Sequence, residues 1–533
     1  MNHYLEMISR SEQLRRLRET EVWQVVVIGG GASGLGAALE AASRGYACVL
    51  FEQADFAKGT SSKATKLVHG GVRYLKQGDV KLVREALRER GILLKNAPHV
   101  TKKQAFIIPC YTYWDLVFYG VGLRVYDALS GRWRLGKTQV LEKKEVLTQM
   151  PGVNAERLKG GILYYDGQFD DSRLALNLAQ TFFREGGLPL NYMQVCGFLE
   201  ENGKLHGVTV QDMENGETFE VYAEVVINAT GVWVDEIARL EDAEARKTVT
   251  LSQGAHVVLN RDFFPSETAL MIPKTSDGRV LFAIPWHNKV VLGTTDRPVQ
   301  YADLEPKVSE EEIAYILETA KPYLAKSPIR TDVLSCWAGL RPLAAPNEEG
   351  GKTKEISRSH KIYVSPKGLI SIVGGKWTTY RAMGEELINE AEDKILGTHK
   401  SSKTKDLKLY GCKDVGFGTH QLAYYGTDEQ LIRALMVESP EFAKELHPNY
   451  PFKVAHVVWA ARYEMARTIE DVLARRTRWL LLDAKTVLEA APLVAKWLAK
   501  ELGWDEQWEA EQVRQFRLLV HQYCGEDMTP RGT

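Results

Sequence analysis

The sequence predicts an α/β protein in which a parallel-sheet domain is interleaved with an antiparallel sheet and followed by an all-helical C-terminal domain. An apolar strand at 25–28 stops at a run of glycines and continues into an alanine-rich helix. A block of β-type sequence at 250–296 interrupts this pattern, and helical patterns resume beyond a polar linker at 397–408. Because 533 residues exceed what one compact core holds, two or three domains are expected.

The glycines after the first strand predict a dinucleotide site. Gly29, Gly31 and Gly34 have the GxGxxG spacing, which allows a tight turn, close approach of the backbone to a pyrophosphate, and close packing of helix and strand. A second strand at 47–51 ends at Glu52, where a carboxylate meets the adenosine ribose. This domain is therefore predicted to be Rossmann-like. Its pyrophosphate and ribose contacts are predicted to come from Gly29, Gly31, Ala32, Ser33, Gly34 and Glu52.

Three later segments are predicted to line the same site. The polar, glycine-flanked stretch 58–75 suits a bound flavin and an anionic ligand, with a solvated loop as the alternative. A strand at 225–228 ends at Ala-Thr-Gly, and a strand at 369–373 ends at Gly-Gly-Lys before a helix whose dipole and lysine would face the flavin. The predicted contacts are Thr60, Ser61, Ser62, Lys66, Leu67, His69, Gly70, Gly71, Ala229, Thr230, Gly231, Gly375, Lys376, Trp377, Thr378 and Thr379.

Composition excludes several classes of function. A net charge of −1 without a basic stripe gives no general attraction to nucleic acid. Six widely spaced cysteines show no metal-binding pattern and indicate free thiols in a reducing, cytoplasmic compartment. Residues 1–20 resemble a charged helix rather than a signal peptide, and no apolar run is long enough to span a membrane. The aromatic and basic stretch 114–137 suits either peripheral membrane contact or a buried helix with a solvated end.

The order of these segments predicts interleaved domains. We expect a leading helix at 1–20, an FAD-binding domain built from 21–105, 165–245 and 355–398, a substrate-binding sheet domain built from 106–164 and 246–354, and a helical C-terminal domain at 399–533. The best helical pattern of the last domain runs from Val457 to Val472.

Five stretches in this order resemble the aerobic FAD-dependent glycerol-3-phosphate dehydrogenases and the related oxidases, which are D-amino-acid-oxidase-like flavoproteins. The resemblance covers nearly all of 20–500. The matching stretches are Thr60-Ser61-Ser62 through Lys66-Leu67-Val68-His69-Gly70-Gly71-Val72-Arg73-Tyr74-Leu75, Gly293-Thr294-Thr295-Asp296, Gly339-Leu340-Arg341-Pro342-Leu343, Gly374-Gly375-Lys376-Trp377-Thr378-Thr379-Tyr380-Arg381, and 464–473.

The resemblance implies a reaction and a set of site residues. Hydride would leave C2 of sn-glycerol 3-phosphate for noncovalent FAD, giving dihydroxyacetone phosphate, and the electrons would pass to a quinone at a peripheral membrane surface. It implies His256 as the first candidate for the base and His69 as the alternative. The remaining implied residues are Lys376, Arg341 and Arg358 in catalysis, and Arg73, Tyr74, Arg341, Arg358, Thr294 and Thr295 in substrate binding. A homodimer is compatible with the sequence.

Alternative functions remain open at this level. An oxidase would pass the electrons to oxygen; the short segment 341–374 favours the dehydrogenase, because the oxidases of the family carry an insertion there. An amine or amino-acid oxidase would need one main arginine for a carboxylate rather than several cations. A non-catalytic FAD-binding module would not need His256, Lys376 and the arginines together.

Overall fold

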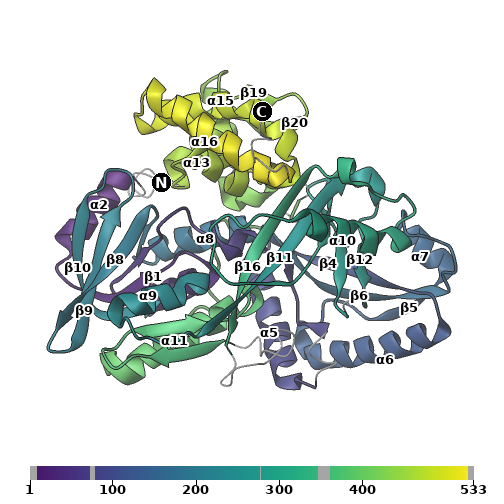
Figure 1. The fold of residues 1–533 in the computed structure, drawn as a ribbon, viewed down its shortest axis with the longest axis horizontal. Coiled ribbons are helices and arrows are strands. Elements are labelled where there is room, and N and C mark those ends of the chain that lie inside the picture. The colour runs from purple at the N-terminus through teal and green to yellow at the C-terminus, as the bar shows by residue number, and fades with distance from the viewer. Residues whose placement is uncertain are drawn as a thin grey trace, which may run out of the picture.

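The computed structural model describes residues 9–72, 78–275, 278–345, 360–414, 416–418 and 420–525. Two sheets lie side by side, and the C-terminal domain lies over both (Figure 1). This arrangement confirms the predicted α/β class, with a Rossmann-like domain, an antiparallel sheet and a helical C-terminal region. Arg73, Tyr74 and Arg358, three of the predicted site residues, lie outside the described residues.

The first sheet contains the predicted glycine-rich strand. Its order is β17–β18–β10–β1–β2–β7, and the strands from β18 to β7 run parallel. Val25 and Val27 pack towards α3 and α8, whereas Val26 and Ile28 pack towards α2 and the β8–β9 meander. Both faces of β1 are therefore covered, which explains its uninterrupted apolar run.

The elements of this half are α2 (Arg10–Glu19), β1 (Trp23–Ile28), α3 (Ala32–Ser43), β2 (Cys48–Phe51), α8 (Asp171–Arg184), β7 (Leu188–Leu190), β8 (Met193–Glu201), β9 (Lys204–Asp212), β10 (Thr218–Asn228), α9 (Val234–Glu241), β17 (Lys361–Val364), β18 (Ile370–Val373) and α11 (Tyr380–Ala391), which continues into a π-helical turn (Glu392–Leu396). The β8–β9 turn falls at Asn202-Gly203, and both residues have positive φ, which suits a tight hairpin.

The second sheet is mostly antiparallel and has the order β15–β11–β14–β13–β12–β4–β6–β3, with β16 beside β11 and β5 beside β6. Two of the predicted domain boundaries, after residue 105 and before residue 165, fall inside single strands of this sheet, β4 and β6. Helix α6 packs on one face and α10 on the other. The elements are β3 (Leu67–Val68), α5 (Val80–Asn96), β4 (Thr101–Cys110), α6 (Tyr113–Ser130), β5 (Gln139–Glu142), α7 (Lys143–Gln149), β6 (Gly160–Phe169), β11 (Val249–Asn260), β12 (Ala269–Ile272), β13 (Leu281–Trp286), β14 (Lys289–Gly293), β15 (Arg297–Val299), α10 (Glu310–Ala320) and β16 (Ser335–Ala344).

The C-terminal domain is helical apart from a short hairpin, so the expectation of an all-helical domain needs that correction. The expected helix from Val457 to Val472 is also wrong: α13 stops at Tyr463, and a π-helical turn begins at Asp471. Met465 has a φ of +55°, which a helix cannot accommodate. The elements are α12 (Glu429–Glu438), β19 (Glu445–His447), β20 (Tyr450–Lys453), α13 (Val454–Tyr463), the π-helical turn (Asp471–Arg476), α14 (Trp479–Leu482), α15 (Ala484–Leu502) and α16 (Glu506–Cys524).

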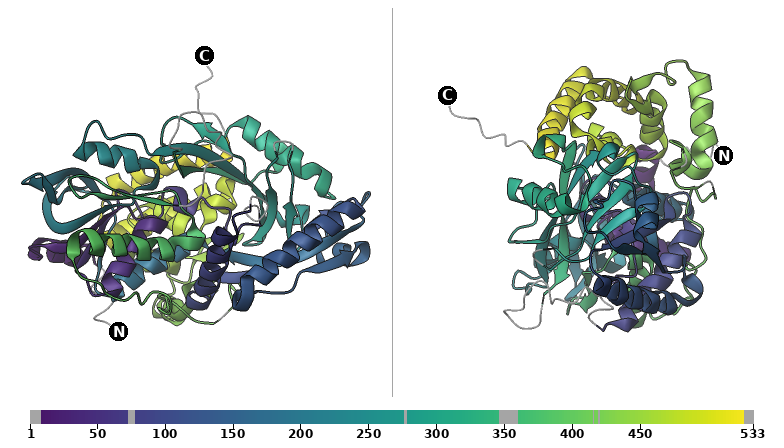
Figure 2. Two further views of the ribbon diagram at one scale, coloured as in Figure 1. Left: turned by 90° about the horizontal axis from the view of Figure 1, so that it is seen from below. Right: turned by 90° about the vertical axis from the view of Figure 1, so that its right-hand side faces the viewer.

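Helix α6 and the C-terminal domain lie at opposite ends of the molecule. In Figure 1 the helix runs along the lower edge below the second sheet, and in the view from below it lies on the near side of the molecule, with the C-terminal helices behind (Figure 2). Among the helices of the described residues, none combines the length and apolarity that a bilayer crossing needs.

Candidate active site

A cavity of about 730 Å³ is lined by residues of both sheets. This volume lies within the range of small-molecule sites, and the walls combine apolar side chains with a few polar groups. Most of the predicted site residues line it. They are Gly29, Gly31, Ala32, Ser33, Glu52, Thr60, Ser61, Leu67, His69, Gly71, Ala229, Thr230, Gly231, His256, Thr294, Thr295, Arg341, Gly375, Lys376, Trp377 and Thr378.

The glycine-rich turn closes one end of the cavity. Gly29 has a φ of +106°, and a Cβ atom on Gly34 would lie 1.8 Å from the carbonyl oxygen of Gly29. Only glycine therefore lets α3 start this close to β1. Gly31 is the N-cap of α3, and the Ala32 N–H donates to the Ser61 hydroxyl at 2.9 Å. The predicted segment 58–75 is thus bonded directly to the turn.

Glu52 follows the end of β2, beside this turn. Its carboxylate accepts hydrogen bonds from the backbone N–H groups of Gly30 at 2.7 Å and Ala54 at 3.0 Å. Burial raises the pKa of the Glu52 carboxyl. A carboxylate oxygen can accept more than one hydrogen bond, so both remain acceptors for a sugar hydroxyl.

The other end of the cavity is built by three neighbouring strands of the second sheet. His256 of β11 pairs with Trp337 of β16 on one side and with Gly293 of β14 on the other. Arg341 of β16 lies opposite Ser252, four residues before His256 on β11. Because alternate residues of a strand share a face, this register places the arginine and the histidine on the same face of the sheet.

Arg341 lies against the end of β14. Its guanidinium donates to the Thr294 hydroxyl at 2.9 Å and reaches Asp296 at 3.4 Å. Asp296 is also 3.6 Å from a second guanidinium, that of Arg279, which lines the cavity as well. Two cations share one carboxylate, so this end of the cavity carries net positive charge and suits an anion such as phosphate.

Sequence reasoning missed Arg279. The β13–β14 pairing contains the signal that reveals it: Phe282 pairs with Gly293, so the same register continued beyond the strands sets Arg279 opposite Asp296. Without knowledge of that pairing, the sequence does not distinguish Arg279 from any other arginine in a turn.

His256 is almost fully buried, with 2% of its surface exposed. Its Nε2 is 2.9 Å from the Thr65 hydroxyl, and its ring stacks on Trp337 at a centroid distance of 5.3 Å. Nδ1 has no hydrogen-bond partner among the described residues. Burial, and secondly the positive charges of Arg341 and Lys66, hold the pKa of His256 well below its usual 6.5. The imidazole is therefore neutral at physiological pH and able to accept a proton.

Lys376 marks the third predicted segment. It is the N-cap of a 3-10 turn (Trp377–Thr379) that leads into α11; it lines the cavity, and its Nζ is buried. The indole N–H of Trp377 donates to the carbonyl oxygen of Ser61 at 2.8 Å. The start of this helix is thereby joined to the Thr60–Ser62 segment, and Lys376 adds a positive charge to the positive end of the helix dipole.

Five predicted cofactor residues are not among those that line the cavity: Gly34, Ser62, Lys66, Gly70 and Thr379. Lys66 departs furthest from the prediction. Its side chain is fully buried, and its ammonium lies 2.8 Å from both oxygens of Asp171 and 2.7 Å from the Ser62 carbonyl oxygen. The Thr295 hydroxyl donates to Glu312 of α10 at 2.7 Å and its carbonyl oxygen accepts from Arg341 at 3.2 Å, whereas Thr294 is bonded to Arg341 through its hydroxyl.

Residues 24–388 match the family model described as FAD dependent oxidoreductase, and residues 371–509 match the C-terminal domain of alpha-glycerophosphate oxidase. The chain belongs to the FAD-dependent oxidoreductase family. It is 37% identical to the mitochondrial glycerol-3-phosphate dehydrogenase of Homo sapiens over 97% of this chain and 76% of that protein. It is 34% identical to the Saccharomyces cerevisiae enzyme of the same name, over 96% and 91% of the two chains.

Solved structures give the same result. The glycerol-3-phosphate dehydrogenase of Bacillus halodurans complexed with FAD superposes with a TM-score of 0.80 at 29% identity, over 98% of this chain and 99% of that one. An L-alpha-glycerophosphate oxidase from Mycoplasma pneumoniae with FAD bound shares the fold, with a TM-score of 0.56 at 18% identity over 72% and 97%. The predicted resemblance and the predicted cofactor, FAD, are thereby confirmed.

The residues of the cavity fit FAD. The turn at Gly29–Gly34 has the tight glycine-dependent form that binds a pyrophosphate in dinucleotide folds, since a Cβ atom at either glycine would clash with backbone, and Glu52 offers oxygens to a ribose. Lys376 and the helix start behind it would lie near the electron-rich edge of a flavin. His256 and Arg341 would then lie at the substrate end.

Proposed function

We propose that the protein oxidises sn-glycerol 3-phosphate to dihydroxyacetone phosphate with FAD as the hydride acceptor and passes the electrons to a quinone. The observation that carries this proposal is the neutral His256 beside the cationic Arg341 on adjacent strands of one cavity wall. The arginine suits the phosphate, and the imidazole suits the proton of the 2-hydroxyl. The names of the relatives support this choice of substrate.

Each group has a role in this reaction. Arg341, with Arg279 across Asp296, binds the phosphate and fixes C2 of the substrate. His256, a neutral imidazole in the cavity wall, takes the 2-hydroxyl proton. FAD, when bound, supplies the acceptor for the hydride on C2. Lys376 stabilises negative charge on the reduced cofactor.

The charges of the site couple substrate binding to the base. Arg341 is the second largest cause that holds the pKa of His256 down, after burial. A phosphate dianion bound to Arg341 offsets that positive charge, so the pKa of His256 rises and the imidazole becomes a stronger base when substrate is present. Arg73, Tyr74 and Arg358 remain predicted contacts to the substrate.

Helix α6 supports a membrane-bound electron acceptor. Its outer face exposes Tyr113 and Trp114 at 72% each and Val117 at 57%, followed along the helix by Phe118, Val121 and Val125. Exposed cations lie at the end of this stripe, at Arg124, Arg132, Arg134 and Lys137. An aromatic and apolar face bordered by cations suits the surface of an anionic lipid bilayer. Docked there, the protein meets a lipid-soluble quinone.

The acceptor is tested by reoxidation. The flavin is reduced anaerobically with sn-glycerol 3-phosphate, and its absorbance is followed after addition of either oxygen or anionic vesicles that contain a quinone. Faster reoxidation with the quinone vesicles supports the dehydrogenase. Faster reoxidation with oxygen, with stoichiometric hydrogen peroxide, would show an oxidase instead.

A further inference from the structure

The segment between β2 and β3, residues 53–66, lies between the cavity and the C-terminal domain, and we call it the cofactor loop. On the cavity side it supplies lining residues from Ala57 to Thr65. It is also bonded to the glycine-rich turn: the Ala57 N–H donates to the Gly30 carbonyl oxygen at 3.0 Å, and the Ser61 hydroxyl accepts from Ala32 at 2.9 Å. The position of this loop therefore helps to set the shape of the FAD site.

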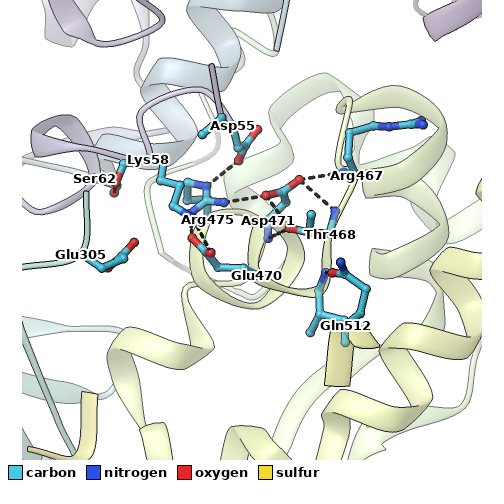
Figure 3. A network of polar contacts seen from close by, with 12 residues as sticks. Asp55, Lys58, Ser62, Glu305, Arg467, Thr468, Glu470, Asp471, Arg475 and Gln512 are labelled. Carbon is cyan, nitrogen blue, oxygen red and sulfur yellow. Dashed lines mark hydrogen bonds and ion pairs between the residues drawn. The ribbon is translucent and has the colours of Figure 1, made fainter. Parts of the chain in front are cut away.

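On the side of the C-terminal domain, the cofactor loop is held by a cluster of buried charges (Figure 3), one of which, Lys58, also lines the cavity. Asp55 accepts a hydrogen bond from Arg475 at 2.5 Å and another from Arg476, and Lys58 donates to Glu470 at 2.7 Å. Arg475 donates further to Glu470 at 2.5 Å and to Asp471 at 2.6 Å. We call this set the ion cluster; its members are Asp55, Lys58, Glu470, Asp471, Arg475 and Arg476.

The ion cluster is balanced and shielded from water. Three carboxylates face three cations, and at most 17% of any of these side chains is exposed. The pKa of Glu470 lies below its usual range because Lys58 and Arg475 outweigh the effect of burial, and the pKa of Asp55 is lowered by Arg476 and Arg475 in the same way. Removing one member of such a set leaves a buried charge without a full complement of partners, which the structure must relieve by movement or protonation.

The backbone before the π-helical turn is arranged around the same cluster. Asp471 accepts hydrogen bonds from the N–H groups of Arg467 at 2.7 Å and Thr468 at 3.0 Å, and from the hydroxyl of Tyr192 at 2.8 Å. Here α13 ends and the expected helix is broken. After the interruption, Glu470 and Arg475 bond to the cofactor loop, and Asp471 bonds to Arg475.

We propose that the ion cluster is a positioning device through which the C-terminal domain holds the cofactor loop in its FAD-binding shape and slows FAD release. The ion cluster bonds to the cofactor loop through Asp55 and Lys58. The proposal rests on FAD binding alone, so it stands or falls separately from the choice of substrate and electron acceptor.

The test compares FAD release with thermal stability in four variants. Arg475→Met removes the cation that bonds all three carboxylates, and Lys58→Met removes the cation supplied by the loop itself. Lys58→Arg keeps that charge and serves as the conservative rescue. Arg462→Met is the matched control, because Arg462 pairs with Glu501 wholly within the C-terminal domain, at 2.5 and 2.9 Å. The rate of FAD release from purified holoprotein and the Tm of the apoprotein are measured for each.

We expect FAD to leave about tenfold faster from Lys58→Met and faster still from Arg475→Met. Lys58→Arg should release FAD at the wild-type rate, and Arg462→Met should lower the Tm without changing release. The proposal is overturned if Lys58→Met, or Arg475→Met where it folds, releases FAD at the wild-type rate and differs from wild type only in Tm. The ion cluster would then join two domains without acting on the cofactor.

Reciprocity gives a second readout that needs no variant. If the ion cluster stabilises the FAD-bound loop, bound FAD must stabilise the ion cluster by the same free energy. Backbone amide exchange at 471–477 should therefore be slower in the holoprotein than in the apoprotein, whereas exchange in α15 should change little. Equal exchange rates at 471–477 in the two forms would contradict the proposal.

Discussion

Replacing Arg341 by methionine tests the assignment of the phosphate site. The side chain keeps similar length and loses its charge and its planar set of donors. Two charge-assisted hydrogen bonds to phosphate, at about 2 kcal/mol each, amount to about 4 kcal/mol. At about 1.4 kcal/mol per factor of ten, kcat/KM for sn-glycerol 3-phosphate should fall about a thousandfold. Arg341→Lys keeps the positive charge but loses the paired N–H donors of the guanidinium, so its kcat/KM should fall less than that of Arg341→Met.

The same variant makes a second, independent prediction about His256. Arg341 lowers the pKa of His256, so its removal should raise that pKa. The protonated imidazole cannot act as a base, so the acid limb of the pH profile of kcat/KM should move to higher pH in Arg341→Met and stay in place in Arg341→Lys. Steady-state kinetics with an artificial electron acceptor measure both effects, and the flavin content of each preparation controls for FAD loss. A loss of kcat/KM below about tenfold in Arg341→Met, with full FAD content, would refute the phosphate assignment.

Three further predictions follow from named contacts. In the wild type, kcat/KM calculated for the dianionic substrate should not titrate at pH 6.5, the ordinary histidine value, because the pKa of His256 lies well below it; a corrected profile that still falls by half at pH 6.5, and does so in His256→Gln too, would assign the base elsewhere. Gly34→Ala should lose FAD, since the new methyl group would lie 1.8 Å from the Gly29 carbonyl oxygen. Gly122→Ala in α6 is the control and should retain FAD, because nothing lies within 4 Å of a Cβ atom there. Fluorescence titration of the two apoproteins with FAD measures the affinity of each; equal affinities would contradict this prediction. The double variant Trp114→Ser/Phe118→Ser should cosediment poorly with anionic vesicles and keep its turnover with a soluble dye. Val437, exposed at 85% on the C-terminal domain, supplies the control: Val437→Ser should bind vesicles like the wild type. Equal cosedimentation of the wild type and both variants would exclude the outer face of α6 as a membrane contact.

The sequence predicted best those features that arise from short-range geometry. The turn at Gly29–Gly34 follows from spacing alone, because its glycines are required by contacts within one strand–turn–helix unit. The apolar run of β1 agrees with the burial of both faces of this strand in the sheet. Arg341 and His256 were identified through the resemblance, and the structure shows why they belong together: both lie on one face of paired strands.

Features that depend on distant contacts could not be predicted. Lys66 belongs to a polar segment that lines the cavity, but its φ of +62° and its pairing with Asp171, 105 residues away, place its charge elsewhere. Arg279 gains its role only through the β13–β14 register. The break after Tyr463 falls within continuous helical spacing, because apolar periodicity does not report the positive φ of Met465 or the hydrogen bonds to Asp471.

Anaerobic titration of the purified holoprotein with sn-glycerol 3-phosphate is the most direct test of the proposed function. The absorbance of the oxidised flavin is recorded as substrate is added in the absence of oxygen, with glycerol and an amino acid such as glycine as parallel additions. The structure-based account predicts rapid bleaching by sn-glycerol 3-phosphate and little by glycerol, which lacks the phosphate that Arg341 binds. Bleaching by the amino acid, or equal bleaching by glycerol and its phosphate ester, would contradict it.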